Sequence, residues 1–153
     1  MERVAEYTRN ILYNYSKKHM EQYMMHNTTT APSGADTHKP VILVVEDDEN
    51  IGMFVVQALT SETPYKAILV TDGLQALHIV DEVKPRLFIT DYRLPYMNGI
   101  ELYDRIRPKI DDTPTIIMSA YMPEQEVQKR QWVSLNKPFE LDDLLNTVER
   151  LLA

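Results

Sequence analysis

The chain of 153 residues contains no cysteine. Disulfide bonds, thiolate nucleophiles and metal sites built on cysteine are therefore excluded. The sequence also has no uninterrupted apolar run close to the roughly 20 residues that a membrane-spanning helix needs. Charged residues interrupt the N-terminus at Glu2, Arg3, Glu6 and Arg9, so the apolar core of a signal peptide is missing too. We expect a soluble, cytoplasmic protein that does not bind a membrane.

An excess of positive charge is also lacking. Lys and Arg number 16 against 23 Asp and Glu, which gives a formal net charge of −7. Residues 1–39 hold five basic and four acidic side chains, so the rest of the chain carries −8. Surfaces that bind nucleic acid need clustered Lys and Arg to displace counterions, and we therefore expect no direct DNA binding. The charge is compatible with a cation, a basic partner or a site built from carboxylates.

A change in composition divides the chain. Residues 27–39 are rich in Thr, Ser, Pro and Gly, which predicts a flexible linker. Residues 1–26 place apolar side chains at roughly helical spacing, which predicts an N-terminal helical extension, with a floppy tail as the alternative. If the helix forms, its apolar stripe must cover the main domain or a second copy of the chain, which would give a homodimer. Residues 40–153 are predicted to form the main domain.

In the main domain, short apolar runs alternate with amphipathic segments. Strands are predicted at residues 41–45, 65–70, 86–90, 115–118 and 132–135. Helices are predicted at residues 51–59, 72–83, 98–106, 123–130 and 140–151. Strands that are apolar throughout and alternate with helices indicate a parallel sheet covered on both faces. The predicted fold class is therefore α/β, a doubly wound five-stranded parallel sheet.

Polar side chains follow the predicted strands at their carboxyl ends, where ligands bind in such sheets. Glu46 and Asp47 follow the first strand, Asp91 the third, Ser119 the fourth and Lys137 the fifth. If the first and third strands are neighbours, three carboxylates converge and repel one another unless a cation lies among them. Their hard oxygen ligands suit Mg²⁺. With an ammonium and a hydroxyl nearby, this site could stabilise a phosphoryl group on Asp91.

Four segments resemble those of a known family. They are Val44–Glu49, Thr90–Gly99, Met118–Ala120 and Lys137–Phe139. Together they resemble the receiver domain of bacterial two-component response regulators, of the stand-alone, chemotaxis-regulator-like kind, over about residues 40–153. The resemblance implies a flavodoxin-like sheet with strand order 2-1-3-4-5. It also implies a signalling protein that is not an enzyme beyond, at most, slow Mg²⁺-dependent self-dephosphorylation.

The resemblance assigns roles to the acidic residues. Asp91 would be the phosphoacceptor, with the phosphoryl group supplied by a histidine kinase or by a phosphotransfer protein. Asp47 would ligate Mg²⁺ directly, Glu46 would do so directly or through water, and the backbone carbonyl of Arg93 would add a ligand. The protein would then be a switch that acts through protein contacts or as a phosphorelay intermediate.

The other segments complete the implied site. The Ser119 hydroxyl would hydrogen-bond a phosphoryl oxygen, Lys137 would pair with the phosphate, and the Lys137–Pro138 peptide bond is expected to be cis. Asp48 has no role in the family, so we interpret it as a helix cap. Phosphorylation would change the partner preference of the surface formed by the fourth helix, fifth strand and fifth helix of the receiver domain.

Two other functions stay open at this point. A receiver fold used without phosphorylation, as an interaction or dimerisation module, would leave Asp91 idle. A hydrolase with an aspartate nucleophile would need a second aspartate two residues later as general acid, and the chain has Arg93 there. The sequence favours the phosphorylated switch over both.

The chain departs from the family pattern near the fifth strand and beside the site. Three residues before the lysine, where the family carries an aromatic, the chain has Ser134, and Trp132 is the nearby substitute. Arg93 and Tyr121 are bulky residues two positions after Asp91 and Ser119. Side chains there would border the path of attacking water, which predicts slow self-dephosphorylation. The alternative is that both simply point to solvent.

Overall fold

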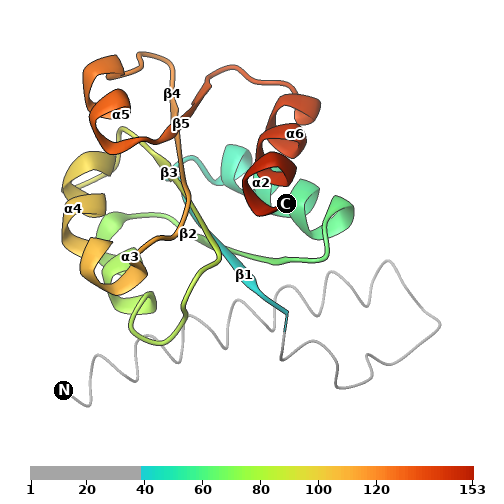
Figure 1. Ribbon diagram of the computed structural model, residues 1–153, viewed down its shortest axis with the longest axis horizontal. Coiled ribbons are helices and arrows are strands. Elements are labelled where there is room, and N and C mark those ends of the chain that lie inside the picture. The colour runs from blue at the N-terminus through green and yellow to red at the C-terminus, as the bar shows by residue number, and fades with distance from the viewer. Residues whose placement is uncertain (1–38) are drawn as a thin grey trace. The chain divides into compact units, whose positions relative to one another are not determined.

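The structure is a computed structural model that describes residues 39–153 (Figure 1). Strands and helices alternate along these residues. The strands are β1 (Val41–Val45), β2 (Lys66–Val70), β3 (Leu87–Asp91), β4 (Thr115–Ser119) and β5 (Val133–Asn136). The helices are α2 (Glu49–Glu62), α3 (Gly73–Ile79), α4 (Gly99–Ile110), α5 (Glu124–Arg130) and α6 (Leu141–Leu152). The helix predicted over residues 1–26, and all but residue 39 of the predicted linker, lie outside the described residues.

The strands form one parallel sheet in the order β2-β1-β3-β4-β5. The predicted flavodoxin-like, doubly wound sheet is therefore confirmed, with β1 and β3 side by side where the strand order reverses. Helices α2 and α6 cover one face of the sheet, and α3, α4 and α5 cover the other (Figure 1). Val45 pairs with Thr90, and Asp91 pairs with Met118, so β1, β3 and β4 end at one edge of the sheet.

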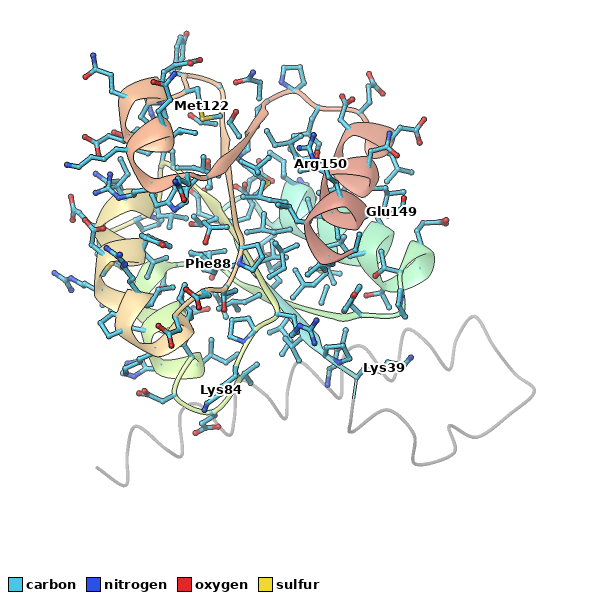
Figure 2. The ribbon with its side chains drawn as sticks, in the orientation of Figure 1. Lys39, Lys84, Phe88, Met122, Glu149 and Arg150 are labelled. Carbon is cyan, nitrogen blue, oxygen red and sulfur yellow. The ribbon has the colours of Figure 1, made fainter. Side chains whose placement is uncertain are left out.

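The core consists of the strands and the helix faces that cover them. Every residue of β3 is buried, and Phe88 lies fully buried in the middle of the packed side chains (Figure 2). Burying a large apolar side chain contributes roughly 1.5–3 kcal/mol to folding. Because both faces are covered, polar residues enter β3 only at its carboxyl end, as Thr90 and Asp91. The sheet therefore holds the end of β3 on a rigid base.

Helix α3 is shorter than predicted. It ends at Ile79, and the prediction that it reaches Val83 is wrong. The backbone N–H groups of Glu82 and Val83 both donate to the carbonyl of Ile79, at 3.0 and 2.8 Å, so the chain closes into a turn. Pro85 follows closely, and a proline disfavours helical backbone in the residue before it. The chain therefore leaves the helix in time to enter β3.

Two strands lie one residue later than predicted. Strand β3 ends with Asp91, and β5 begins at Val133, so Trp132 precedes the strand. Asp91 is thus a paired strand residue and not the first residue of a loop. None of the helices in the described part of the chain is long and apolar enough to cross a membrane.

Helix α4 begins directly against the end of β3. The N–H of Gly99, the first residue of α4, donates to the carbonyl of Tyr92 at 2.7 Å. A Cβ on Gly99 would lie 2.5 Å from the carbonyl oxygen of Asp91 and 3.3 Å from the Cα of Tyr92. Because these neighbours are backbone atoms, only a glycine allows this approach.

We expect Gly99→Ala to lower the free energy of unfolding by about 1–3 kcal/mol, because the added methyl must displace the end of β3. The matched control is Gly73→Ala at the first residue of α3. Its Cβ would meet the Cγ and Sδ atoms of Met97 at 2.8 Å, and that flexible side chain can move away. Urea unfolding measures both variants. Equal destabilisation would contradict the backbone constraint at Gly99.

Candidate functional site

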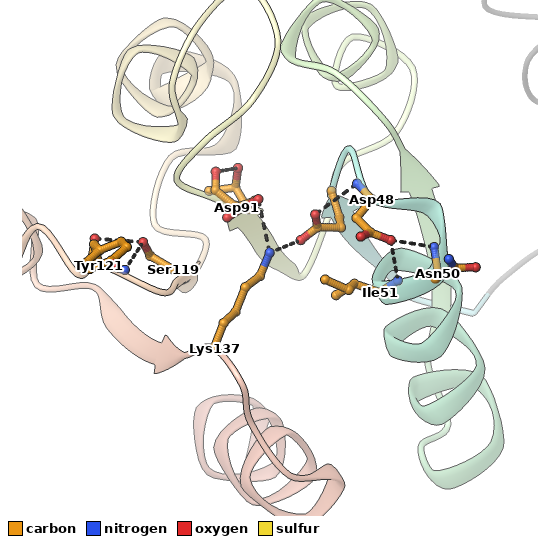
Figure 3. A network of polar contacts seen from close by, with 9 residues as sticks. Asp48, Asn50, Ile51, Asp91, Ser119, Tyr121 and Lys137 are labelled. Atoms are coloured by element: carbon orange, nitrogen blue, oxygen red, sulfur yellow. Dashed lines mark hydrogen bonds and ion pairs between the residues drawn. The ribbon is translucent and has the colours of Figure 1, made fainter.

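The predicted site residues gather at the carboxyl edge of the sheet (Figure 3). Glu46 and Asp47 follow β1, Asp91 ends β3, Ser119 ends β4, and Lys137 follows β5. One carboxylate oxygen from each of Glu46, Asp47 and Asp91 lies within 4.8 Å of the other two. The convergence of three carboxylates, predicted from the neighbouring positions of β1 and β3, is therefore present.

Glu46 is the buried member of this cluster, with 0% of its surface exposed. Its Oε1 accepts a hydrogen bond from the backbone N–H of Asp48 at 3.1 Å, and its Oε2 accepts one from Lys137 Nζ at 2.7 Å. Burial raises the pKa of Glu46 to about 7, and the negative charge of Asp91 adds to the rise. The hydrogen bond from Lys137 opposes this rise without cancelling it. Glu46 therefore holds its negative charge less readily than an ordinary carboxyl.

Lys137 places its ammonium between two carboxylates. Nζ lies 2.7 Å from Glu46 Oε2 and 3.1 Å from Asp91 Oδ2 (Figure 3). Burial by itself lowers the pKa of Lys137, but its hydrogen bond to Glu46 and the charges of both carboxylates outweigh burial and raise the pKa. The ammonium therefore stays charged and offsets part of the repulsion between the two acids.

The backbone fixes Lys137 from its other end. Its N–H donates to the carbonyl of Ser119 at 2.9 Å. The Lys137–Pro138 peptide bond is cis, as the resemblance implies. The long side chain therefore starts from a defined point beside β4 and reaches back across the edge of the sheet.

Asp91 and Asp47 face outward more than Glu46 does. Asp91 is 7% exposed, and Asp47 is exposed. The backbone of Asp91 is fixed, because its carbonyl accepts a hydrogen bond from the Thr90 hydroxyl at 3.0 Å and Tyr92 N–H donates to the Met118 carbonyl at 2.9 Å. A small reactant can thus approach a carboxylate whose position is well defined.

The Ser119 hydroxyl lies at the same edge but is bonded to its own loop. It donates to the backbone carbonyl of Tyr121 at 2.8 Å and accepts from the Tyr121 N–H at 3.1 Å. No hydrogen bond joins it to Asp91 or Lys137 among the described residues. The Ser119 hydroxyl is therefore bonded to the Tyr121 backbone and not to the carboxylates.

Arg93 and Tyr121 contact each other beside the site. The guanidinium carbon of Arg93 lies 5.8 Å from the centre of the Tyr121 ring, within the range of a cation–π interaction. Both side chains are exposed, so this contact joins the loop after β3 to the loop after β4. The role of the Arg93 backbone carbonyl as a metal ligand stays a prediction.

Asp48 is a helix cap, as predicted. Its carboxylate accepts hydrogen bonds from the N–H groups of Asn50 and Ile51 at 2.9 and 3.2 Å, at the start of α2 (Figure 3). Capping satisfies two backbone donors that the helix itself leaves free. The adjacent acids Asp47 and Asp48 thus have different surroundings, and only Asp47 belongs to the carboxylate cluster.

The donor set fits a hard divalent cation. The three carboxylates of Glu46, Asp47 and Asp91 outnumber the single ammonium of Lys137, so the cluster keeps an excess of negative charge. Mg²⁺ is bound in proteins by one or two carboxylates, waters and phosphate oxygens. An exposed Asp47 beside a partly accessible Asp91 leaves room for such additional ligands.

Two contributors to the site were not identified from the sequence. Gly99 allows the start of α4 to lie against the backbone of Asp91. The only sign of this in the sequence is that a glycine directly follows Asn98, the cap of the helix. The backbone of Tyr121 holds the Ser119 hydroxyl, and backbone contacts leave no mark on residue type. Both contributions are contacts of the backbone.

Comparison with known proteins identifies relatives of the whole α/β domain. A family model described as the response regulator receiver domain matches residues 42–149. The chain is 30% identical over 115 residues to Sporulation initiation phosphotransferase F of Bacillus subtilis, which covers 72% of this chain and 92% of that protein. Other relatives are much longer, and the chain spans 8% of one and 27% of another.

Solved structures of similar fold cover the same domain. The structure of chemotaxis response regulator CheY4 of Vibrio cholerae has a TM-score of 0.69 at 28% identity, covering 74% of this chain and 99% of that chain. The receiver domain of sensor histidine kinase PA1611 of Pseudomonas aeruginosa has a TM-score of 0.64 at 26% identity, covering 74% and 98%. In that second structure a magnesium ion is coordinated in the active site cleft.

The buried Glu46 should give a pH signature in metal-free buffer. Its pKa is about 7 in the folded protein and ~4.3 in an unfolded chain, so folding favours the protonated form. The resulting stabilisation is present below the unfolded pKa and is lost as pH rises through the folded pKa. We expect the stability of the wild type relative to Glu46→Gln to fall by about 1–3 kcal/mol between about pH 5 and pH 8.

Urea unfolding in EDTA at the two pH values measures this difference. Subtracting the variant cancels the titration of the other carboxylates, and glutamine keeps an oxygen that can accept from the Asp48 N–H. A difference that stays constant or grows with pH would show that the charged form of Glu46 is not disfavoured in the folded protein.

Proposed function

The chain belongs to the family of response regulator receiver domains, and from this premise we propose that it is a phosphorylation-dependent signalling switch. Receiver domains are phosphoacceptor signalling domains of two-component systems. Asp91 accepts the phosphoryl group from a histidine kinase or a phosphotransfer protein. The observation that carries the proposal is the Asp91 carboxylate, 3.1 Å from the Lys137 ammonium and within the three-carboxylate cluster.

The transfer step follows from this arrangement. A carboxylate oxygen of Asp91 attacks the phosphorus of a phosphohistidine, so that a P–O bond forms while the P–N bond breaks and the imidazole leaves. Negative charge builds up on the phosphoryl oxygens, and the ammonium of Lys137 lies where it can stabilise that charge. Positioning and electrostatics thus supply most of what phosphoryl transfer requires.

We further propose that Glu46, Asp47, Asp91 and the backbone carbonyl of Arg93 hold Mg²⁺. Support comes from the donor set of this cluster and from the magnesium ion in the related receiver domain of PA1611. When bound, the ion neutralises charge on the attacking carboxylate and on the phosphoryl oxygens. Asp47 would be the exposed ligand, while the buried Glu46 holds Lys137 in place by a hydrogen bond.

The output begins at Ser119. Its hydroxyl bonds Tyr121, and a phosphoryl group on Asp91 offers acceptor oxygens that compete for it. If Ser119 turns toward them, the loop between β4 and α5 loses two hydrogen bonds and shifts. The surface of α5, β5 and α6 then changes its preference for protein partners. We also propose that residues 1–26 form an N-terminal extension, residues 27–39 a linker and residues 40–153 the receiver domain.

Two other functions are less well supported. A module that uses only the fold for binding would give no reason for three carboxylates to converge and for an ammonium to pair with two of them. A hydrolase needs a general acid two residues after Asp91, and the Arg93 found there contacts Tyr121. A phosphorelay intermediate stays within the proposal, since the Bacillus subtilis relative is named a phosphotransferase.

We expect the purified protein to gain one phosphoryl group from acetyl phosphate in the presence of Mg²⁺. Asp91→Asn should gain none, because the nucleophile is gone. Asp47→Asn should reduce the rate about tenfold or more, because it removes a metal ligand. Intact-mass spectrometry over time measures all three proteins.

Asp48→Asn is the matched control for Asp47→Asn. It removes the neighbouring carboxylate, but asparagine caps a helix about as well as aspartate, so labelling should continue at the wild-type rate. Labelling of Asp91→Asn, or labelling unaffected by EDTA, would contradict the proposed site.

We propose that phosphate loss from the labelled protein is slow, with the Arg93 and Tyr121 side chains, which contact each other, bordering the approach of water to Asp91. The double variant Arg93→Ala, Tyr121→Ala should lose phosphate several-fold faster. Release of inorganic phosphate after removal of acetyl phosphate gives the rate.

Tyr121→Phe is the control, because it keeps the ring that Arg93 contacts and should keep the slow rate. Complete loss of phosphate from the wild type within seconds, or an unchanged rate in the double variant, would count against this barrier to water.

A further inference from the structure

Trp132 lies buried directly before β5 and has no part in the site described above. Its side chain is 7% exposed and packs with Ile117 of β4 and Val127 of α5. Gln131, at the end of α5, has a left-handed backbone with φ of 57°, and the N–H of Trp132 donates to the carbonyl of Val127 at 3.1 Å. This turn folds the indole back against α5.

Arg130 fastens α5 to α4 across the indole. Its Nη2 lies 3.0 Å from Asp104 Oδ2 and its Nε 3.3 Å from Asp104 Oδ1, while Nη1 pairs with Glu126 of the same helix. The guanidinium carbon lies 5.2 Å from the centre of the Trp132 ring. Helices α4 and α5 lie on the same face of the sheet (Figure 1). The Arg130–Asp104 pair therefore closes over Trp132.

Aromatic contacts complete the cluster. The ring of Tyr103, on α4 beside Asp104, meets the Trp132 ring edge to face, with the centres 4.7 Å apart. Tyr92 and Met122 pack against the same buried residues; Figure 2 shows Met122 near the start of α5. The cluster around the indole thus includes residues of β4 and α5 and of the loops that follow β3 and β4.

Those segments are the ones that phosphorylation would move. Tyr92 immediately follows Asp91, and Ile117 precedes Ser119 by two residues. Met122 directly follows Tyr121, whose backbone holds the Ser119 hydroxyl. A shift of this loop therefore acts on the packing around Trp132.

Helix α5 depends on these contacts for its position. It has seven residues, and helices shorter than about 12–15 residues are marginal by themselves. Pro123 at its N-cap provides no capping hydrogen bond from a side chain. Exposed ion pairs usually contribute little, but the Arg130 side chain is only 15% exposed and meets Asp104 with two nitrogens. The pair is therefore well placed to hold the helix.

The closed arrangement also leaves a polar group unsatisfied. The indole Nε1 of Trp132 is buried and has no hydrogen-bond partner among residues 39–153, which the structure describes. Leaving a buried donor unpaired is unfavourable, so any shift that exposes it to water relieves that cost. The unpaired indole N–H thus favours a shift of α5, and the Arg130–Asp104 pair opposes it.

We propose that the Arg130–Asp104 ion pair, closed over Trp132, is a latch that holds α5 against α4 in the unphosphorylated protein and opens when Asp91 is phosphorylated. This inference rests on the proposed function. It places the coupling between site and output surface at Trp132, because Ser134 on β5 is small and exposed.

Reciprocal coupling makes the latch testable. If phosphorylation opens the latch, weakening the latch must favour phosphorylation by the same factor. Beryllium fluoride with Mg²⁺, which mimics an aspartyl phosphate, serves as the probe, and Trp132 is the only tryptophan in the chain, so its fluorescence reports the latch. We expect Asp104→Asn to bind the probe about threefold to tenfold more tightly than the wild type. Even without beryllium fluoride, the Trp132 emission of Asp104→Asn should lie at longer wavelength than that of the wild type. Acrylamide should also quench it more strongly.

Asp81→Asn is the matched control. Asp81 pairs with Lys109 of the same helix α4, and its side chain is 57% exposed against 52% for Asp104, but it lies away from Trp132. This variant should bind beryllium fluoride with wild-type affinity and show wild-type emission.

A second variant, Arg130→Gln, should behave as Asp104→Asn does. Combining Arg130→Gln with Asp104→Asn should add little to either single change, because both remove the same Arg130–Asp104 interaction.

The outcomes distinguish failure of the proposed function from failure of the latch. If the wild type shows no Asp91-dependent response to beryllium fluoride, the proposed function fails and the latch with it. If the wild type responds and Asp104→Asn loses stability without a change in affinity or emission, the ion pair only stabilises α5 and the latch is overturned. Weaker binding by Asp104→Asn would also overturn it, because the pair would then favour the phosphorylated arrangement.

Discussion

The ammonium of Lys137 between Glu46 and Asp91 is the contact on which the site depends. A parallel sheet with β1 beside β3 brings the ends of both strands together, and with them carboxylates that repel one another. Lys137 offsets this repulsion from a fixed point beside β4. The remaining excess of negative charge makes the same place attractive to a divalent cation and, with it, to a phosphoryl group.

The fold separates a site held by the sheet from a short helix held by side-chain contacts. Asp91 lies at the end of a fully buried strand, and Gly99 brings the start of α4 against its backbone. Helix α5 is short, has no side-chain cap, and takes its position from Trp132 and the Arg130–Asp104 pair. In the proposed latch, charge added at Asp91 therefore changes the packing around α5 without distorting the sheet.

Local patterns made the sheet and the acidic cluster predictable from the sequence. Apolar runs marked the strands, the carboxyl-end rule pointed to Glu46 and Asp91, and the position of Asp48 before a helix identified a cap. The bonds of the Ser119 hydroxyl and the surroundings of Trp132 were not predictable, because they depend on loops and helices that meet only in the folded chain. The early end of α3 likewise reflects the path that the chain must take into β3.

Asp91 is the proposed carrier of the phosphoryl group. Reducing the acetyl phosphate-labelled protein with borohydride tests it most directly, since borohydride converts an aspartyl phosphate into homoserine and leaves free carboxylates unchanged. After digestion, peptide mass spectrometry locates the homoserine. We expect homoserine at position 91 alone, formed only when Mg²⁺ was present during labelling. Homoserine at Asp47 or another carboxylate, or a stable phosphate that borohydride does not reduce, would contradict it.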